Sequence, residues 1–187
     1  MKSNILTAIK LTILCLIFFS GIYTLLVLGA AKFAHNKGRG ETIEHNGKIF
    51  FANVGQRFTE DKYFYSRPSA VDYNAAGAGG SNKGPSNPAY LADVQSRIDS
   101  FLVHNPGIQK NEIPADLVTA SGSGIDPNIS VMAANVQVKR IAAIRKILVG
   151  RIEDLVLSQT EKPFLGVFGP EKINVLKLNI ALDELKN

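Results

Sequence analysis

Two glycine-rich segments are the places where this sequence comes nearest to a chemical motif. Residues 120–124 read Ala-Ser-Gly-Ser-Gly, which sets glycines around a serine but lacks the G-x-S-x-G spacing of a nucleophile elbow. Residues 79–84 read Gly-Gly-Ser-Asn-Lys-Gly, which imitates a phosphate loop but lacks its G-x-x-x-x-G-K-[ST] order. Both segments are therefore predicted to be polar loops that either turn tightly or present backbone groups to a partner.

The side chains that could act as acids, bases or metal ligands are dispersed along the chain. The three histidines, His35, His45 and His104, have no metal-ligand spacing, and no two carboxylates stand out as an acid–base couple. Arg67, which precedes Pro68, could clamp an anion or pair with a carboxylate, and a structural salt bridge is the favoured interpretation. An enzyme and a metal site are therefore both disfavoured.

The charge distribution argues against a nucleic-acid-binding protein. The 187 residues carry a net charge of +5, but Lys2, Lys10 and Lys32 flank an apolar run. From residue 33 onward the chain has 18 of the 21 basic residues and all 16 acidic residues, so the net charge of this part is +2. A nucleic-acid interface needs a concentrated basic face. The only cysteine, Cys15, lies inside the apolar run, so no disulfide can form in the rest of the chain.

The apolar run at residues 11–31 is predicted to span a membrane. Its 21 residues contain no charge, and at 1.5 Å per residue such a helix crosses a hydrocarbon core of about 30 Å. A cleaved signal peptide is the alternative, but the run is longer than the usual apolar region of such peptides. We expect residues 1–10 in the cytoplasm, 11–31 in the membrane and 32–187 as an extracytoplasmic domain, although the flanking charges favour neither orientation.

Local signals predict that residues 32–187 form one small α+β domain, so the fold class is one transmembrane helix followed by a mixed α/β domain. Asn46-Gly47 predicts a hairpin turn, Asn87-Pro88 opens a helix, and Ser130 caps another. Residues 73–88 form a long glycine-, asparagine- and serine-rich loop. The expected elements are a hairpin at 42–52, a helix at 88–104, an extended piece at 114–119, one or two helices (joined near 147–150) at 131–158, a strand at 172–178 and helical turns at 179–185.

Several blocks of residues occur in a fixed order behind the apolar run. They are Tyr63-Phe64-x-x-Arg67-Pro68-Ser69-Ala70, Tyr73-Asn74, Gly79-Gly80-Ser81-Asn82, Ser86-Asn87-Pro88, the segment 117–126, Gln137, Arg140, Ala143-x-Arg145, Asn174-Val175-Leu176 and Leu178-Asn179-x-Ala181-Leu182-Asp183. In these blocks the chain resembles a known family, the C subunit of the Kdp-type potassium-transporting ATPase. It departs from the family at Tyr23-Thr24, where the anchor usually has Tyr-Pro.

The resemblance implies a non-catalytic subunit of an ATP-driven, high-affinity potassium import complex in the inner (cytoplasmic) membrane. The implied partners are a potassium-translocating A subunit, a P-type ATPase B subunit and a small membrane peptide, together with membrane lipid. ATP and potassium are associated with the complex, and no cofactor is expected to bind this chain tightly. The family member is described as necessary for assembly and as a catalytic chaperone that raises the ATP affinity of the ATPase subunit. The glutamine implicated in that effect resembles Gln137.

An extracytoplasmic domain conflicts with direct contact to ATP, which is cytoplasmic. Any effect on ATP affinity would then be a coupling through the membrane subunits. The competing interpretation is a cap over the outer ion entrance, made by Arg67, Asn74, Gly80, Ser81, Asn82, Ser121, Gly122, Ser123, Gly124 and Asp126. For Gln137, a helix-surface or interface amide is the alternative to a nucleotide role. The rival function is a membrane-anchored extracytoplasmic enzyme or ligand-binding domain.

Overall fold

The computed structural model describes residues 2–34 and 36–185 and divides the chain into two compact units. The first unit runs to Thr42 and the second begins at Ile43.

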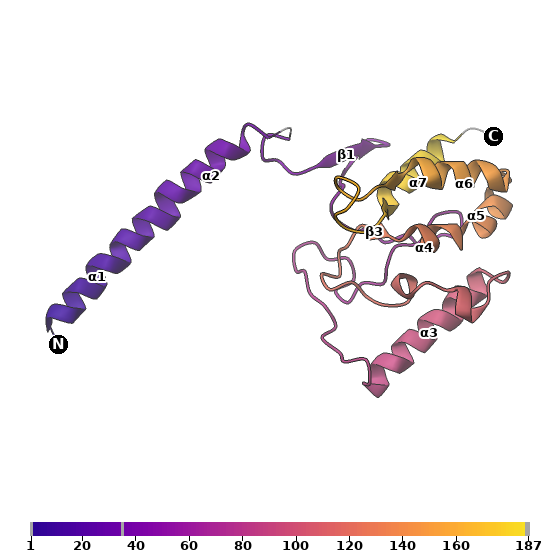
Figure 1. The fold of residues 1–187 in the computed structure, drawn as a ribbon, viewed down its shortest axis with the longest axis horizontal. Helices are drawn as coiled ribbons and strands as arrows, with labels where there is room; N and C mark the ends of the chain where they lie inside the picture. The colour runs from indigo at the N-terminus through magenta and orange to yellow at the C-terminus, as the bar shows by residue number, and fades with distance from the viewer. Residues whose placement is uncertain (1, 35, 186–187) are drawn as a thin grey trace. The chain divides into compact units, whose positions relative to one another are not determined.

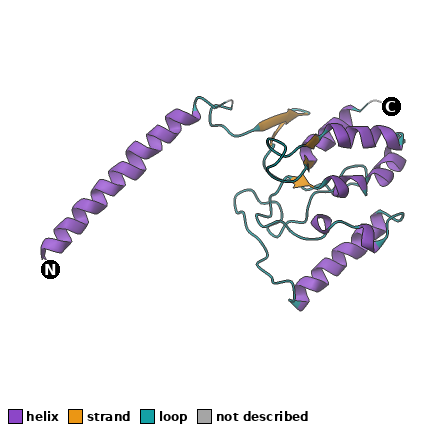
Figure 2. Ribbon diagram, in the orientation of Figure 1, coloured by secondary structure: helices purple, strands orange, loops and turns teal. Residues whose placement is uncertain are grey.

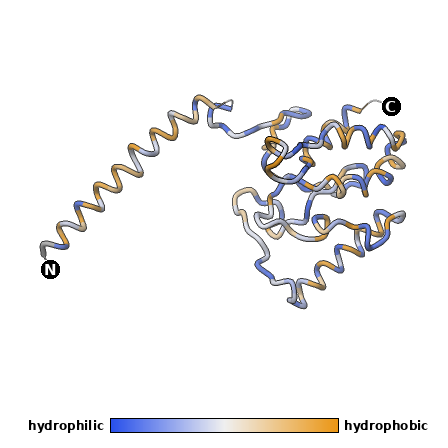
Figure 3. The backbone as a smooth tube through the Cα atoms, viewed as in Figure 1, coloured by the Kyte–Doolittle hydropathy of each residue, from blue (hydrophilic) through white to orange (hydrophobic). Residues whose placement is uncertain are grey.

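The first unit is dominated by one continuous apolar helix (Figures 1 and 2). It comprises α1 (Lys2–Leu16), a π-helical stretch (Ile17–Tyr23) and α2 (Thr24–Ala31). Residues Asn4–Ala31 are long and apolar enough to cross a membrane, with a mean hydropathy of 2.5 and 0% of the apolar window buried (Figure 3). The helix therefore begins earlier than predicted. At about 1.5 Å per residue it exceeds a hydrocarbon core of about 30 Å, so it would tilt or extend beyond the core.

The π-helical stretch ends at Tyr23-Thr24, the position at which the resemblance implied Tyr-Pro. Thr24 Oγ1 donates to the carbonyl oxygen of Phe19 at 3.0 Å, five residues earlier. A proline at this position would lack the N–H that Thr24 donates to Gly21. The chain thus stays helical through Thr24.

The predicted hairpin lies at the start of the second unit, with β1 (Thr42–His45) beginning at the boundary residue and β2 (Lys48–Phe51) following. Asn46 and Gly47 have φ of +50° and +72°. Positive φ at both central residues is the type I′ geometry that Asn-Gly favours. The hairpin prediction is confirmed.

The helix predicted at 88–104 is also confirmed as α3 (Pro88–His104). The Asn87 side chain accepts the Tyr90 N–H at 3.1 Å and Pro88 occupies the first turn. The extended piece predicted at 114–119 is wrong, because a 3₁₀ turn (Ala115–Leu117) lies there and buries Leu117. A second 3₁₀ turn (Lys110–Glu112) precedes it.

Residues 131–158 form three short helices where one or two were predicted. They are α4 (Val131–Asn135), which Ser130 caps as expected, α5 (Val138–Arg145) and α6 (Val149–Ser158). The break between α5 and α6, at a left-handed Lys146 (φ +58°), lies close to the predicted junction. The break at Gln137, whose side chain accepts the N–H of the distant Tyr65 at 2.8 Å, was not foreseen.

Three short strands form an antiparallel sheet in the order β3-β5-β4. They are β3 (Asn128–Ile129), β4 (Thr160–Glu161) and β5 (Lys172–Asn174). The strand predicted to reach residue 178 ends at Asn174, whose side chain accepts the Lys177 N–H at 3.1 Å and starts α7 (Val175–Glu184). Helices α4 to α7 and β5 enclose the core, which includes Phe64, Ile141, Ile152, Ile173, Leu178 and Leu182.

Candidate functional site

The two glycine-rich loops predicted from the sequence lie against each other through their main chains. The Gly79 N–H donates to the carbonyl oxygen of Ser123 at 2.8 Å. A Cβ at Gly80 would lie 3.0 Å from the carbonyl oxygen of Gly122, so only glycine permits this approach without displacement. We call residues 79–80 and 121–126 together the loop platform.

Gly124 is the tightest point of the loop platform. Its φ is +70°, and an added Cβ would lie 2.6 Å from Cγ2 of Val71 and 2.8 Å from the carbonyl oxygen of Gly79. Gly122 is exposed, and nothing lies within 4 Å of its ideal Cβ. Two glycines separated by one residue thus have opposite roles: Gly124 closes the packing between the loops, and Gly122 faces outward.

Arg67 forms an ion pair with Asp126, the last residue of the loop platform. Arg67 Nη1 lies 3.0 Å from Asp126 Oδ2, and the two side chains are 25% and 29% exposed. The other carboxylate oxygen accepts the Asn128 N–H at 3.0 Å. Tyr73 donates its hydroxyl to the Arg67 carbonyl oxygen at 2.6 Å. The salt-bridge interpretation of Arg67 is confirmed, although Arg67 Nε is buried without a partner among the described residues.

The remaining predicted site residues contribute differently. Ser121 is buried, and its N–H donates to the carbonyl oxygen of Pro68 at 3.4 Å. Asn74 is exposed and its side chain accepts the Ala76 N–H at 3.0 Å, which is a local turn. Ser81 and Asn82 are exposed, and Asn82 has a φ of +53°. The structure therefore brings the backbones of the two loops together beside Arg67 and Asp126. The Asn74 side chain takes no part in this contact and forms a separate local turn.

Several carbonyls of the loop platform are already hydrogen-bonded within the domain. Those of Ser121, Ser123 and Ile125 accept from Gly124, Gly79 and Gly55 at 3.3, 2.8 and 2.7 Å. These bonds hold the loops together, so a cation would have to share the same oxygens.

Gln137 is fully buried, which makes the helix-surface alternative for this residue wrong. Its Oε1 accepts the Tyr65 N–H at 2.8 Å and Nη2 of Arg140 at 2.8 Å. Its Nε2 donates to the carbonyl oxygen of Ala133 at 2.9 Å. Both lone pairs of the oxygen are thus used inside the domain.

Arg140 extends this buried network to the segment around residue 63. Only 8% of the residue is exposed, and burial lowers the pKa of its guanidinium. It donates to Oδ1 of Asn105 at 2.9 Å and to the carbonyl oxygens of Tyr63 and Asp61. Its Cζ lies 4.2 Å from the centre of the Tyr65 ring. Neutral oxygens and an aromatic face therefore satisfy this buried cation.

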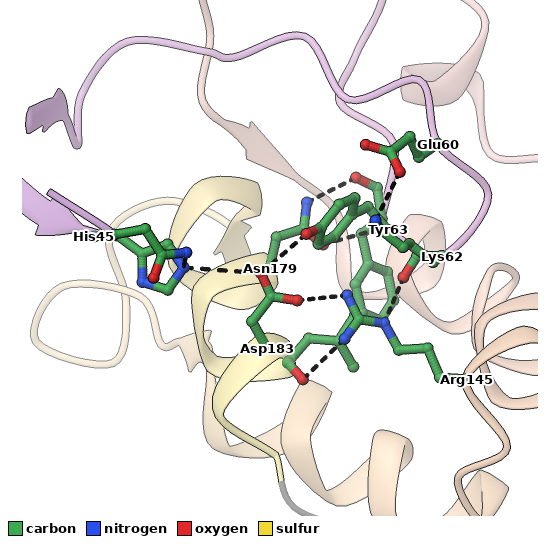
Figure 4. Close-up of polar contacts among 10 residues, drawn as sticks. His45, Glu60, Lys62, Tyr63, Arg145, Asn179 and Asp183 are labelled. Carbon is green, nitrogen blue, oxygen red and sulfur yellow. Dashed lines mark hydrogen bonds and ion pairs between the residues drawn. The ribbon is translucent and has the colours of Figure 1, made fainter. Parts of the chain in front are cut away.

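Two residues of α7 hold the same segment from the other side (Figure 4). Asn179 accepts the Phe64 N–H at 2.9 Å and donates to the Phe64 carbonyl oxygen at 3.0 Å. Asp183 lies 2.6 Å from Nη2 of Arg145 and accepts the Tyr63 hydroxyl at 3.0 Å. Burial and this hydrogen bond raise the pKa of Tyr63. The blocks that carried the family resemblance are therefore largely bonded to one another.

One cluster of titratable groups was missed by sequence reasoning. His104 Nδ1 lies 2.8 Å from Oδ1 of Asp61, which also accepts the Tyr65 hydroxyl. That hydrogen bond, with His104 and Arg140, lowers the pKa of Asp61, and burial raises the pKa of Tyr65 to about 12. Asp61 and His104 lie far apart in the sequence, so no motif could have linked them.

No group of three or more metal-ligating side chains is found among residues 2–34 and 36–185. The loop platform, which brings together predicted site residues from two distant loops, is the candidate functional site.

Comparison with known proteins gives one consistent match. A family model described as "K+-transporting ATPase, c chain" matches residues 5–184. The Potassium-transporting ATPase KdpC subunit of Flavobacterium psychrophilum is 55% identical over 184 residues, covering 98% of this chain and 99% of the relative. The KdpC subunits of Bacteroides fragilis and Caldanaerobacter subterraneus subsp. tengcongensis are 51% and 40% identical, covering 98% and 100% of this chain and 98% of each relative.

Proposed function

The chain belongs to the KdpC family of potassium-transporting ATPase subunits, and on that premise we propose that it is an accessory subunit that assembles the complex from outside the cytoplasm. Membership makes it a component of a potassium transport complex. The proposal adds its partners, which are a potassium-translocating subunit, a P-type ATPase subunit and a small membrane peptide. It also places the chain in the cytoplasmic membrane with its C-terminal domain on the outer side.

The loop platform is the observation that carries the docking part of this proposal. Its two loops are fixed by main-chain hydrogen bonds and by glycines that permit close approach, such as Gly80 and Gly124. Gly122 is nevertheless exposed on it, and Ser81 and Asn82, which directly follow Gly80, are exposed as well. A polar surface that is rigid before binding loses little conformational entropy when a partner covers it. The loop platform therefore suits a permanent contact over the outer face of the potassium-translocating subunit.

The buried position of Gln137 supports an indirect effect on ATP. The side chain has no exposed surface, and its oxygen is held by Tyr65 and Arg140. A nucleotide could reach it only if this part of the core opened. A change of ATP affinity in the ATPase subunit would then be a coupling free energy that this domain transmits through its contacts.

A bulky side chain at Gly122 tests the docking proposal. The Gly122→Tyr variant should fold, because nothing lies within 4 Å of the ideal Cβ. Gly107→Tyr is the matched control, since Gly107 is also exposed with open space at its Cβ. The proposal predicts that Gly122→Tyr lowers recovery of the assembled complex and potassium-stimulated ATP hydrolysis, and that Gly107→Tyr does not. Normal assembly and hydrolysis with Gly122→Tyr would refute docking through the loop platform.

A further inference from the structure

The loop between β4 and β5 ends in an exposed apolar tip, residues 164–168. The four large apolar side chains Phe164, Leu165, Val167 and Phe168 are 73%, 74%, 78% and 66% exposed. Single exposed apolar residues are ordinary, but a contiguous group marks an interaction surface. The family resemblance did not draw on this segment, and the loop platform does not include it.

The backbone of the apolar tip is hydrogen-bonded within itself. Phe164 and Phe168 exchange N–H···O bonds of 3.0 Å in both directions, and the Gly166 N–H donates to the carbonyl oxygen of Pro163 at 2.9 Å. Leu165 and Gly166 take φ of +54° and +73°, which closes the turn. The peptide groups of this turn are largely hydrogen-bonded to one another. Transfer of the tip from water to lipid therefore costs little free energy, because few backbone donors and acceptors lose a partner.

The tether keeps the second unit, which carries the apolar tip, within reach of the bilayer that the apolar helix could cross. Eleven residues, 32–42, separate the end of the apolar helix from the second unit. Fully extended, they reach at most about 40 Å. A surface held at that range meets lipid at a high effective concentration.

The chemistry of the apolar tip also fits a lipid boundary better than a protein groove. Lys162 is exposed beside the apolar tip, where its ammonium group could reach lipid phosphates while the apolar side chains point further in. Lys172, on the other side of the tip, is paired with Glu161 at 3.6 Å. Four side chains on a narrow turn also form too small a surface for a specific protein interface, which needs about 1,000 Å² or more.

We propose that residues 164–168 insert into the headgroup–acyl boundary of the membrane and give the domain a second, peripheral lipid contact. Together with the apolar helix, this contact would fix the orientation of the second unit at the membrane surface. The inference rests on the membrane helix and not on the proposed role in transport.

Tryptophan fluorescence tests the insertion directly, because the chain contains no tryptophan. Phe168→Trp would place a single fluorophore in the apolar tip. Leu157→Trp is the matched control, because Leu157 is 73% exposed on α6, outside the tip. The full chain of each variant is reconstituted into phosphatidylcholine vesicles with and without brominated acyl chains. We expect lipid bromine to reduce Phe168→Trp emission at least about two-fold and to leave Leu157→Trp emission unchanged.

A charge in the apolar tip provides a second readout. Adding Leu165→Asp to Phe168→Trp should abolish the quenching without lowering the unfolding temperature, because Leu165 is exposed and aspartate tolerates its positive φ. Equal quenching of both tryptophan positions, or none at Phe168→Trp, would overturn the proposal. A tryptophan at 168 that is shielded from aqueous iodide but not quenched by lipid bromine would show that protein covers the tip, and would also overturn it. None of these readouts depends on transport.

Discussion

The amide oxygen of Gln137 accepts the Tyr65 N–H at 2.8 Å, a bond that joins residues 72 positions apart. The same oxygen accepts Nη2 of Arg140, so one buried atom connects the junction of α4 and α5 to the segment beside α7. Gln137, for which a nucleotide role was predicted, therefore has a structural role, because its buried side chain holds two distant segments together.

Gln137→Leu should therefore destabilise the domain. It leaves the Tyr65 N–H and one Arg140 N–H without an acceptor in the core, and each such loss costs about 1–3 kcal/mol. Thermal unfolding of the full chain in detergent would measure the change. Gln95→Leu, at an exposed position of α3, should stay within about 0.5 kcal/mol. If Gln137→Leu unfolds like wild type yet lowers the ATP affinity of the assembled complex, the structural account of this residue fails.

Glycine substitutions should separate the two sides of the loop platform. Gly124→Ala forces a Cβ against Val71 and Gly79 at a φ of +70°, and should cost about 1–3 kcal/mol of unfolding free energy. Gly122→Ala meets open space and should be close to neutral. Urea unfolding of both variants would measure the difference. Equal stabilities would show that the loops do not pack as described.

The ion pair of Arg67 and Asp126 should contribute modestly to stability. Both side chains are partly exposed, so water screens their attraction. A double-mutant cycle of Arg67→Ala and Asp126→Ala should give a coupling of about 0.5–1 kcal/mol. A coupling of several kcal/mol would instead indicate that the ion pair is shielded from water, which would contradict the partial exposure of the two side chains.

The stability of the domain should fall in alkaline solution partly because of Tyr65. Burial, and secondly the hydrogen bond to Asp61, raise its pKa to about 12, above the usual value of about 10. The folded state keeps the proton that the unfolded state loses, so this contribution is complete below about pH 10 and is lost as pH rises to about 12.

Urea unfolding at several pH values from 8 to 12 should show a steeper loss for wild type than for Tyr65→Phe. At pH 8 the variant should lose about 0.5–1.5 kcal/mol of unfolding free energy, the usual value of one hydrogen bond. Parallel pH profiles would contradict the assigned environment of Tyr65.

Local sequence signals predicted the elements whose cause is local. The hairpin at Asn46-Gly47, the cap at Asn87 and the cap at Ser130 each depend on residues within a few positions, and all three are present. The strand expected at 172–178 failed because alternation was read past Asn174, whose amide caps a helix. Short strands and short helices share apolar patterns that periodicity alone cannot separate.

The long-range bonds could not be predicted from the sequence. Asn179 pairs with the Phe64 backbone across 115 positions, and His104 meets Asp61 without any motif that joins them. The loops of the loop platform were placed on polar composition, and their mutual contact at Gly79 and Ser123 emerges only from the fold. The resemblance identified the family from separate blocks of residues. The structure shows that many of these blocks contact one another in the folded chain.

Co-purification tests the central claim most directly. A C-terminal tag on the full chain, gentle extraction of the native membrane and mass spectrometry of the purified material would identify its partners. We predict recovery with a potassium-translocating subunit and a P-type ATPase subunit. Recovery of the chain alone, as a stable monomer or homodimer, would contradict the account.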